Sequence, residues 1–276
     1  MPSVTLTKCQ GTGNDFLLLD NRDGLRFQYA ALARAACDRR FGVGADGLLV
    51  LLRPATNAEA DVAMRIFNAD GSEAEMCGNG IRCVARYLVR EGRQPRRLAV
   101  QTPAGVVRTE LTDAPGMVRV EMGTPALARP LEGSFEFGGR TFRCARISMG
   151  NPHAVIFVDD ALDAYPLAEF AAAASAACGD AGGVNVELAR LTTDRLQMRI
   201  HERGVGETWA CGTGACAAAV AAIATGRLTS PIEVETRGGS VNVAWDGADA
   251  TALLTGPAEI VFETTLELAG DVLASA

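Results

Sequence analysis

Two cysteines stand directly before glycine-rich turns, Cys77 in MCGNGIRC (residues 76–83) and Cys211 in ACGTGACA (residues 210–217). The apolar spacing after the first turn predicts a helix that begins at Gly78. The N-terminus of a helix has unpaired N–H groups and partial positive charge, which lower the pKa of a nearby thiol. A lone cysteine is more often a buried apolar side chain, so either motif alone leaves both readings open.

An internal repeat connects the two motifs. The shift that places Cys77 on Cys211 aligns MRIFNADGSEAEMCGNGIRCVA with MRIHERGVGETWACGTGACAAA without a gap. Earlier in each half, GNDFLLLD from Gly13 resembles GNPHAVIFVDD from Gly150. Duplicated halves commonly pack about a pseudo-twofold axis, which predicts that the two cysteines face each other across one cleft, each at the N-terminus of its own helix.

Paired thiols of this kind suit the inversion of a carbon that carries a weakly acidic hydrogen. A base removes the proton from one face while an acid supplies a proton to the other. Thiol and thiolate lie close in free energy near neutral pH, so two cysteines can exchange these roles. Helix N-termini would stabilise the negative charge that develops on a neighbouring carboxylate.

Composition excludes several other classes of protein. The 276 residues are 48% hydrophobic and 21% charged, with a net charge of -7, so no nucleic-acid partner is expected. The sequence shows no signal peptide and no uncharged apolar run of about 18 residues, so no membrane partner is expected and the cytoplasm is the expected location.

Cofactor and metal chemistry also receive little support. The eight cysteines include no CxxC pair, and His153 and His201 are the only histidines, so we expect thiols, no disulfides and no metal. Lys8 is the only lysine and lies in a segment with strand-like alternation, which disfavours a pyridoxal phosphate Schiff base. The sequence therefore predicts chemistry without a cofactor.

Hydrophobic periodicity predicts a mixed fold with few helices. Helices are expected at Tyr29–Asp38, Gly78–Glu91, Leu167–Cys178 and Gly212–Thr225. Strands are expected at Val4–Gln10, Phe16–Asp20, Leu48–Arg53, Val62–Asn68, Leu98–Thr102, Val106–Leu111, Val118–Met122, Phe142–Ser148, Ala154–Asp159, Val184–Leu191, Leu196–Glu202, Ile232–Thr236, Ser240–Trp245 and Thr251–Thr255. The helix after Cys211 is small-sided and apolar on every face, which predicts burial at the centre of its domain.

Two domains are expected, residues 1–123 with Cys77 and residues 124–261 with Cys211. The boundary is placed in GTPALARP, and residues 262–276 could return to the first domain as a strand.

Five separated motifs, GTGNDF, FNADGSEAEMCGNGIRC, GNPHAV, GVNVEL and ERGVGETWACGTGACA, make the sequence closely resemble the diaminopimelate epimerases along essentially its whole length. The resemblance implies an α/β fold of the α+β type, with two similar pseudo-twofold-related domains, each a mixed or antiparallel sheet wrapped around a central helix. It also implies a cofactor-independent epimerase that interconverts LL- and meso-2,6-diaminopimelate in lysine and peptidoglycan precursor biosynthesis, acting as a homodimer.

Carried over to matching positions, the resemblance implies that Cys77 and Cys211 are the catalytic acid and base. His153 and Glu202 resemble residues that tune the pKa of the two thiols. The implied substrate-binding residues are Asn14, Asn68, Gly78, Asn79, Asn151, Asn185, Glu202, Arg203, Gly212 and Thr213. One departure is Gly47, which stands where many members of the family carry a substrate-contacting glutamine.

Three alternatives remain at this point. A related two-cysteine racemase of proline, hydroxyproline or another amino acid would share the Cys-Gly-x-Gly helix starts. A thiol redox sensor would use Cys77 and Cys211 as a reversible disulfide. Taken without the family, His153 is more often structural, and asparagines such as Asn68 are common turn formers.

Overall fold

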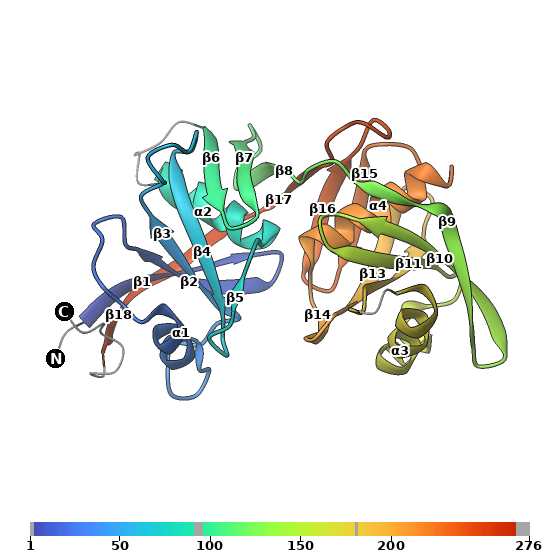
Figure 1. Cartoon of the computed structure of the whole chain (residues 1–276), viewed down its shortest axis with the longest axis horizontal. Coiled ribbons are helices and arrows are strands. Elements are labelled where there is room, and N and C mark those ends of the chain that lie inside the picture. Colours follow the sequence, from blue (N-terminus) through green and yellow to red (C-terminus); the bar gives the residue numbers. More distant parts are fainter. Residues whose placement is uncertain (1–2, 91–95, 180–181, 269–276) are drawn as a thin grey trace. The chain divides into compact units, whose positions relative to one another are not determined.

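The computed structural model describes residues 3–90, 96–179 and 182–268. The chain divides into two compact units (Figure 1). The first unit comprises Met1–Val120 and Gly256–Ala276, and the second comprises Glu121–Thr255. Among the described residues, no helix has the length and apolar character that crossing a membrane requires.

The first unit is built on a mixed sheet. Its strands pair in the order β18 (Glu259–Glu267), β1 (Ser3–Gly11), β2 (Asn14–Asp20), β3 (Gly47–Leu52), β4 (Val62–Asn68), β6 (Arg97–Thr102), β7 (Gly105–Leu111) and β8 (Met117–Glu121). The short β5 (Glu73–Ala74) also pairs with β4. The pairs β2–β3 and β4–β6 are parallel, and the others are antiparallel.

The second unit repeats this order strand for strand. Its strands pair in the order β9 (Ala126–Phe137), β10 (Arg140–Ser148), β11 (Pro152–Phe157), β12 (Asn185–Leu191), β13 (Arg195–Glu202), β15 (Ile232–Thr236), β16 (Gly239–Ala244) and β17 (Leu253–Pro257). The short β14 (Gly206–Thr208) pairs with β13, and a 3-10 turn, η1, covers Leu162–Ala164. Again two pairs are parallel, β11–β12 and β13–β15.

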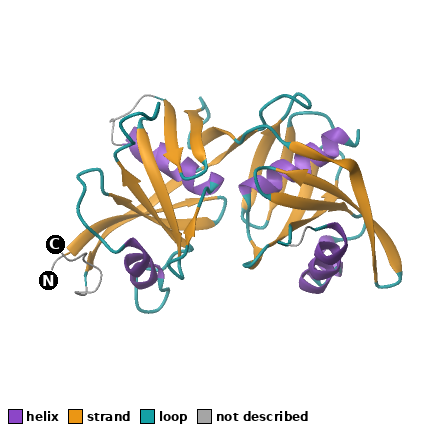
Figure 2. Ribbon diagram, in the orientation of Figure 1, coloured by secondary structure: helices purple, strands orange, loops and turns teal. Residues whose placement is uncertain are grey.

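Each unit encloses one helix and carries a second helix on the outer face of its sheet (Figure 2). The enclosed helices are α2 (Gly78–Arg90) and α4 (Gly212–Ala224), and the outer helices are α1 (Tyr29–Cys37) and α3 (Leu167–Cys178). Helix α4 contacts six strands of its unit, β10 to β13, β15 and β16. Its small side chains, from Ala215 to Ala222, are at most 1% exposed, which confirms the predicted burial.

Alternation along the strands assigns the two sheet faces. In the second unit, Ala154 and Ile156 of β11 and Val186 and Leu188 of β12 pack in one cluster with α3. The residues between them therefore point to the opposite face, which α4 covers. The alternation therefore places His153 of β11 and Asn185 and Glu187 of β12 on the face beside the start of α4.

The predicted helix starts at Gly78 and Gly212 are confirmed. Glu91, the expected last residue of the first of these helices, lies outside the described residues, as do the last residues of the expected 262–276 segment. Strand β18 pairs with β1 along its length. Strand β9 was not expected, because it occupies the stretch around Pro130 that was interpreted as a linker.

One prediction about the cysteines is wrong. Cys144 and Cys178, which were expected to be thiols, form a disulfide. Cys144 lies on the α3 side of β10, and Cys178 is the last residue of α3, so packing of the helix on the sheet brings the two together. They are 34 residues apart in the sequence, so local spacing gave no sign of the pair.

Candidate active site

Cys77 directly precedes the first residue of α2 in the first unit. Its Sγ accepts a hydrogen bond from the backbone N–H of Gly80, at 3.5 Å. A Cβ on Gly80 would lie 2.8 Å from Cδ2 of the buried Leu49 and 3.7 Å from Cβ of Cys77. The glycine therefore lets the first turn of the helix pack closely against β3 while the thiol stays at the helix N-terminus.

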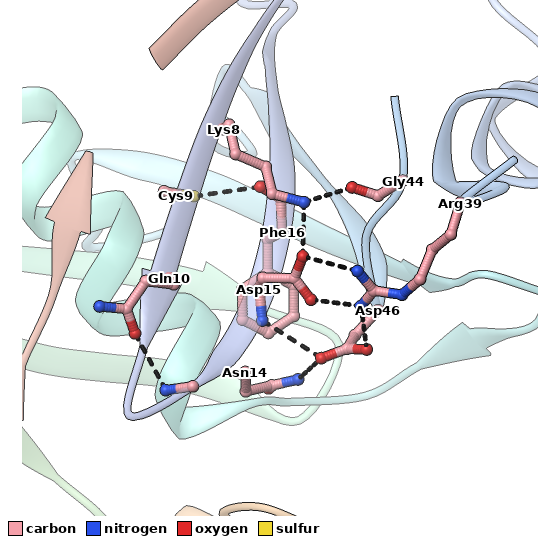
Figure 3. A network of polar contacts seen from close by, with 10 residues as sticks. Lys8, Cys9, Gln10, Asn14, Asp15, Phe16, Arg39, Gly44 and Asp46 are labelled. Atoms are coloured by element: carbon pink, nitrogen blue, oxygen red, sulfur yellow. Dashed lines mark hydrogen bonds and ion pairs between the residues drawn. The ribbon is translucent and has the colours of Figure 1, made fainter. Parts of the chain in front are cut away.

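The side-chain amide of Asn14 lies next to this thiol. Its Oδ1 is 3.9 Å from Cys77 Sγ and accepts a hydrogen bond from Asn79 Nδ2 at 3.3 Å. On the other side, Asn14 Nδ2 donates to Asp46 Oδ2 at 2.8 Å (Figure 3). Two residues predicted to bind substrate, Asn14 and Asn79, are thus brought together beside Cys77.

Asp46 belongs to a charged network behind Asn14 (Figure 3). Arg39 Nη2 lies 2.8 Å from Asp46 Oδ1 and 2.6 Å from Asp15 Oδ1. Lys8 Nζ donates to Asp15 Oδ2 at 2.5 Å and to the carbonyl of Gly44. Burial alone would raise the pKa of Asp15, but the hydrogen bonds from Arg39 and Lys8 outweigh it and lower that pKa to about 2. The network therefore holds the segment before β3 against β1 and β2.

Cys211 occupies the equivalent position in the second unit, directly before α4. Its Sγ lies 3.3 Å from Thr213 Oγ1. A Cβ on Gly214 would be 2.8 Å from Glu187 Oε1 and 3.5 Å from Cys211 Cβ. Burial first, and then the charge of Glu202, raise the pKa of the Cys211 thiol well above its ordinary value, while the hydrogen bond with Thr213 lowers it.

A chain of hydrogen bonds runs from the sheet to Cys211. Glu187 Oε1 is 2.6 Å from His153 Nδ1, and His153 Nε2 is 3.0 Å from Asn151 Oδ1. Asn151 Nδ2 then donates to Thr213 Oγ1 at 3.4 Å. The side chains of His153 and Glu187 are both fully buried. Three residues predicted from the sequence, Asn151, His153 and Thr213, are therefore connected to one another and to the thiol.

Glu187 was missed as a site residue. In GVNVEL it follows a valine in a buried strand, and the available signal was a carboxylate in an otherwise apolar run. The alternation of side chains along β12 directs Glu187 to the face of the sheet that α4 covers. Burial there raises the pKa of its carboxyl group. Its other oxygen, Oε2, finds no hydrogen-bond partner among the described residues.

Three further predicted residues lie in the second unit: Asn185, Glu202 and Arg203. Asn185 Oδ1 accepts from the backbone N–H of Arg203 at 2.9 Å, and Asn185 Nδ2 donates to the Pro152 carbonyl at 3.3 Å. The Arg203 guanidinium donates to the Gly182 carbonyl at 3.1 Å. Glu202 Oε1 accepts from Thr208 Oγ1 at 2.5 Å.

In the first unit, Asn68 ends β4 and donates to Ser72 Oγ at 2.9 Å, as a turn-forming asparagine does. Within the part of the chain that the structure describes, no group of three or more His, Cys, Asp or Glu side chains could hold a metal ion.

The sequence profile of the diaminopimelate epimerases matches residues 6–128 and 145–261. The chain belongs to the diaminopimelate epimerase family. It is 45% identical to the diaminopimelate epimerase of Pelotomaculum thermopropionicum over 274 residues, which cover 93% of this chain and 96% of the relative. It is 41% identical to that of Cupriavidus pinatubonensis, covering 96% of this chain and 98% of the relative.

Solved structures share the fold at much lower identity. A probable proline racemase from Agrobacterium radiobacter superposes with a TM-score of 0.71 at 15% identity, over 96% of this chain and 93% of the other. A hydroxyproline epimerase from Agrobacterium vitis gives a TM-score of 0.70 at 17% identity, over 96% and 92%. These likenesses support the fold assigned to the diaminopimelate epimerase family and carry no information on substrate.

Gly47 is the position at which a departure from the diaminopimelate epimerase pattern was expected. It begins β3 and pairs with Asn68 of β4. A Cβ at this position would lie 2.8 Å from the carbonyl oxygen of Phe67. This oxygen belongs to the backbone of β4, so it cannot easily move away to relieve the clash. The close pairing of β3 with β4 therefore disfavours any larger side chain here, including glutamine.

Proposed function

We propose that this protein is a cofactor-independent epimerase that interconverts LL-2,6-diaminopimelate and meso-2,6-diaminopimelate, in lysine and peptidoglycan precursor biosynthesis. The observation that carries the proposal is the duplicated Cys-Gly-x-Gly helix start, with Cys77 before α2 and Cys211 before α4. The similarity to diaminopimelate epimerases over nearly the full length of both chains supports this substrate.

In the proposed mechanism, one thiolate removes the α-proton and the other thiol returns a proton to the opposite face. Negative charge then develops on the substrate α-carboxylate, and the N–H groups at the starts of α2 and α4 suit its stabilisation. Removing one such donor from enzymes that stabilise oxyanions costs about 3 to 4 kcal/mol. The glycines after each cysteine allow backbone N–H groups to approach the substrate closely.

Substrate recognition is proposed for the polar residues around the two thiols. A diamino diacid requires acceptors for its ammonium groups and donors for its carboxylates, and the forked Arg203 guanidinium suits the distal carboxylate. His153 and Glu202 are proposed to tune the thiols. The proposed substrate contacts are Asn14, Asn68, Gly78, Asn79, Asn151, Asn185, Glu202, Arg203, Gly212 and Thr213.

Independence from pyridoxal phosphate is part of the proposal. Lys8 is the only lysine of the chain, and its ammonium group is bonded to Asp15 and to the Gly44 carbonyl, which supports a structural role. We propose a cytoplasmic location, and a homodimer from the family resemblance. Sedimentation of the purified protein measures the oligomeric state.

The test is proton NMR of the reduced protein with LL-diaminopimelate in D2O, without added cofactor. We expect meso product and loss of the α-proton signal. Cys77→Ala and Cys211→Ala are expected to abolish both, whereas Cys37→Ala, which removes a buried thiol of α1, should retain turnover. Turnover of proline or hydroxyproline instead of diaminopimelate would refute the substrate, and near-normal turnover by either catalytic variant would refute the thiol pair.

A further inference from the structure

The two units surround equivalent cysteines with different side chains. The parallel pairs place Phe16 opposite Gly47 in the first unit and His153 opposite Asn185 in the second. Two residues further along, Leu49 of β3 and Glu187 of β12 are therefore equivalent. A Cβ on Gly80 would meet the first of these side chains, and a Cβ on Gly214 would meet the second.

As a result, the equivalent asparagines are fixed through different atoms of their side-chain amides: Asn14 through its Nδ2 and Asn151 through its Oδ1. In the first unit the partner is the carboxylate of Asp46, which is also paired with Arg39. A carboxylate only accepts hydrogen bonds, so Nδ2 of Asn14 must point to Asp46. Its Oδ1, an acceptor, is thereby left facing Cys77 at 3.9 Å.

In the second unit the partner of the asparagine is His153, which is fixed by Glu187. Both side chains are fully buried, so a pair with net negative charge would be costly there. A net-neutral pair shares one proton between Glu187 Oε1 and His153 Nδ1 and keeps a second proton on Nε2.

With Nε2 as a donor, Oδ1 of Asn151 accepts and its Nδ2 donates to Thr213 Oγ1. The Thr213 hydroxyl proton is then free to point at Cys211 Sγ, 3.3 Å away. If Nε2 lost its proton, the amide would turn over and the hydroxyl would point away from the thiol. The direction of the whole chain therefore depends on Glu187.

We propose that the two units present side-chain hydrogen bonds of opposite polarity to their cysteines, an acceptor from Asn14 to Cys77 and a donor from Thr213 to Cys211, and that Asp46 and Glu187 are the positioning residues that set these polarities. The inference rests on the proposed function only in taking the two cysteines as acid and base. An acceptor favours the protonated thiol at Cys77, and a donor favours the thiolate at Cys211.

Other charged groups face each thiol within its own unit. Around Cys211 these are Glu202 of β13 and Glu187 of β12, and the charge of Glu202 opposes the thiolate. His153 of β11 lies behind them, 2.6 Å from Glu187 Oε1. The donor from Thr213 counteracts burial and this charge. Behind Asn14, the charged groups are those of the Lys8, Asp15, Arg39 and Asp46 network.

The experiment measures the pH midpoint of iodoacetamide alkylation separately for Cys77 and Cys211, by mass spectrometry of their peptides. The midpoint reports the thiolate fraction and does not require turnover, so its outcome is independent of the substrate assignment. The variants are Glu187→Leu, Thr213→Val and Asp46→Ala. Asp38→Ala is the matched control for Asp46→Ala, because it also removes a carboxylate from the segment between α1 and β3. The Asp38 carboxylate accepts hydrogen bonds from the N–H groups of Arg40 and Phe41.

We expect Glu187→Leu and Thr213→Val each to raise the Cys211 midpoint by about one pH unit. At any pH well below the midpoint, the thiolate fraction would then be about tenfold smaller. Because both act through one chain, the double variant should show no further shift. Asp46→Ala should lower the Cys77 midpoint, since Asn14 can then turn its Nδ2 towards the thiol.

A fall in the Cys211 midpoint of Glu187→Leu would overturn the proposal, because it would show that direct charge repulsion outweighs the chain. Unchanged midpoints, or additive shifts in the double variant, would also overturn it. If Glu187→Leu does not fold, Thr213→Val decides the second unit alone. An equal shift of Cys77 in Asp38→Ala would refute the role of Asp46.

Discussion

One added methyl group at Gly214 tests how closely α4 packs against the polar pair beneath it. In Gly214→Ala the new Cβ would lie 2.6 Å from Ile200 Cδ1 and 2.8 Å from Glu187 Oε1, and both must retreat to at least 3.4 Å. Overpacking of a buried site costs about 1 to 3 kcal/mol. Replacing glycine by alanine inside a helix stabilises the helix by about 1 kcal/mol. A fully buried carboxyl group has no room to move, so we expect an overpacking cost in the upper part of that range, about 2 to 3 kcal/mol. After the gain from alanine, the free energy of unfolding should fall by about 1 to 2 kcal/mol.

The matched control is Gly80→Ala at the equivalent position of α2. There the new Cβ meets only the flexible end of Leu49 closer than 3.0 Å, with Cδ2 at 2.8 Å. Repacking of a leucine end costs less than displacing a carboxylate, and the helix gain offsets it, so we expect stability within about 1 kcal/mol of the parent protein.

Urea unfolding separates the two outcomes. Both tryptophans, Trp209 and Trp245, lie in the second unit, so fluorescence reports that unit, and circular dichroism reports both. Displacement of Glu187 in Gly214→Ala should also reduce epimerisation and raise the alkylation midpoint of Cys211. Parent-like stability and turnover in Gly214→Ala would refute the packing argument, as would equal losses in the two variants.

Three further outcomes are expected. Gly47→Gln and Gly47→Ala should both lower the free energy of unfolding by about 1 to 3 kcal/mol, because the shared Cβ meets a backbone oxygen; a stabilised glutamine variant in urea unfolding would contradict this. The lowered pKa of Asp15, from 3.8 to about 2, contributes stability that is present above pH 3.8 and is lost as the pH falls through about 2. That contribution amounts to about 2 kcal/mol, and Asp15→Asn should remove this part of the acid dependence of urea unfolding. Cys178→Ala should lower the stability of the second unit by about 4 kcal/mol for its 34-residue loop, and dithiothreitol should abolish the difference in fluorescence-monitored unfolding.

The parts of the fold that the sequence predicted correctly are those with strong local patterns. The alanine-rich helix after Cys211 was apolar on every face and is enclosed by strands, and the repeat of the Cys-Gly-x-Gly turn located both helix starts. Strand β9 escaped detection because most of its residues are at least partly exposed and Pro130 interrupts its pattern. Only its last residues, SFEF (residues 134–137), alternate between polar and apolar.

The site residues that escaped detection depend on contacts between distant segments. The alternation of side chains along β12 decides which face of the sheet Glu187 points to. Its contact with His153, however, depends on the parallel register of β11 and β12, which no local pattern specifies. The pairing of Cys144 with Cys178 similarly depends on where α3 docks. In both cases the missing information is tertiary.

The position of β18 has a consequence for the order in which the protein is made. This strand pairs with β1, yet it follows every residue of the second unit in the chain. A ribosome therefore releases the second unit as one continuous segment with all its strands, while the first unit still lacks an edge partner for β1. Until synthesis passes residue 267, β1 exposes unpaired backbone groups, so folding of the emerging chain can be completed in its second part before its first.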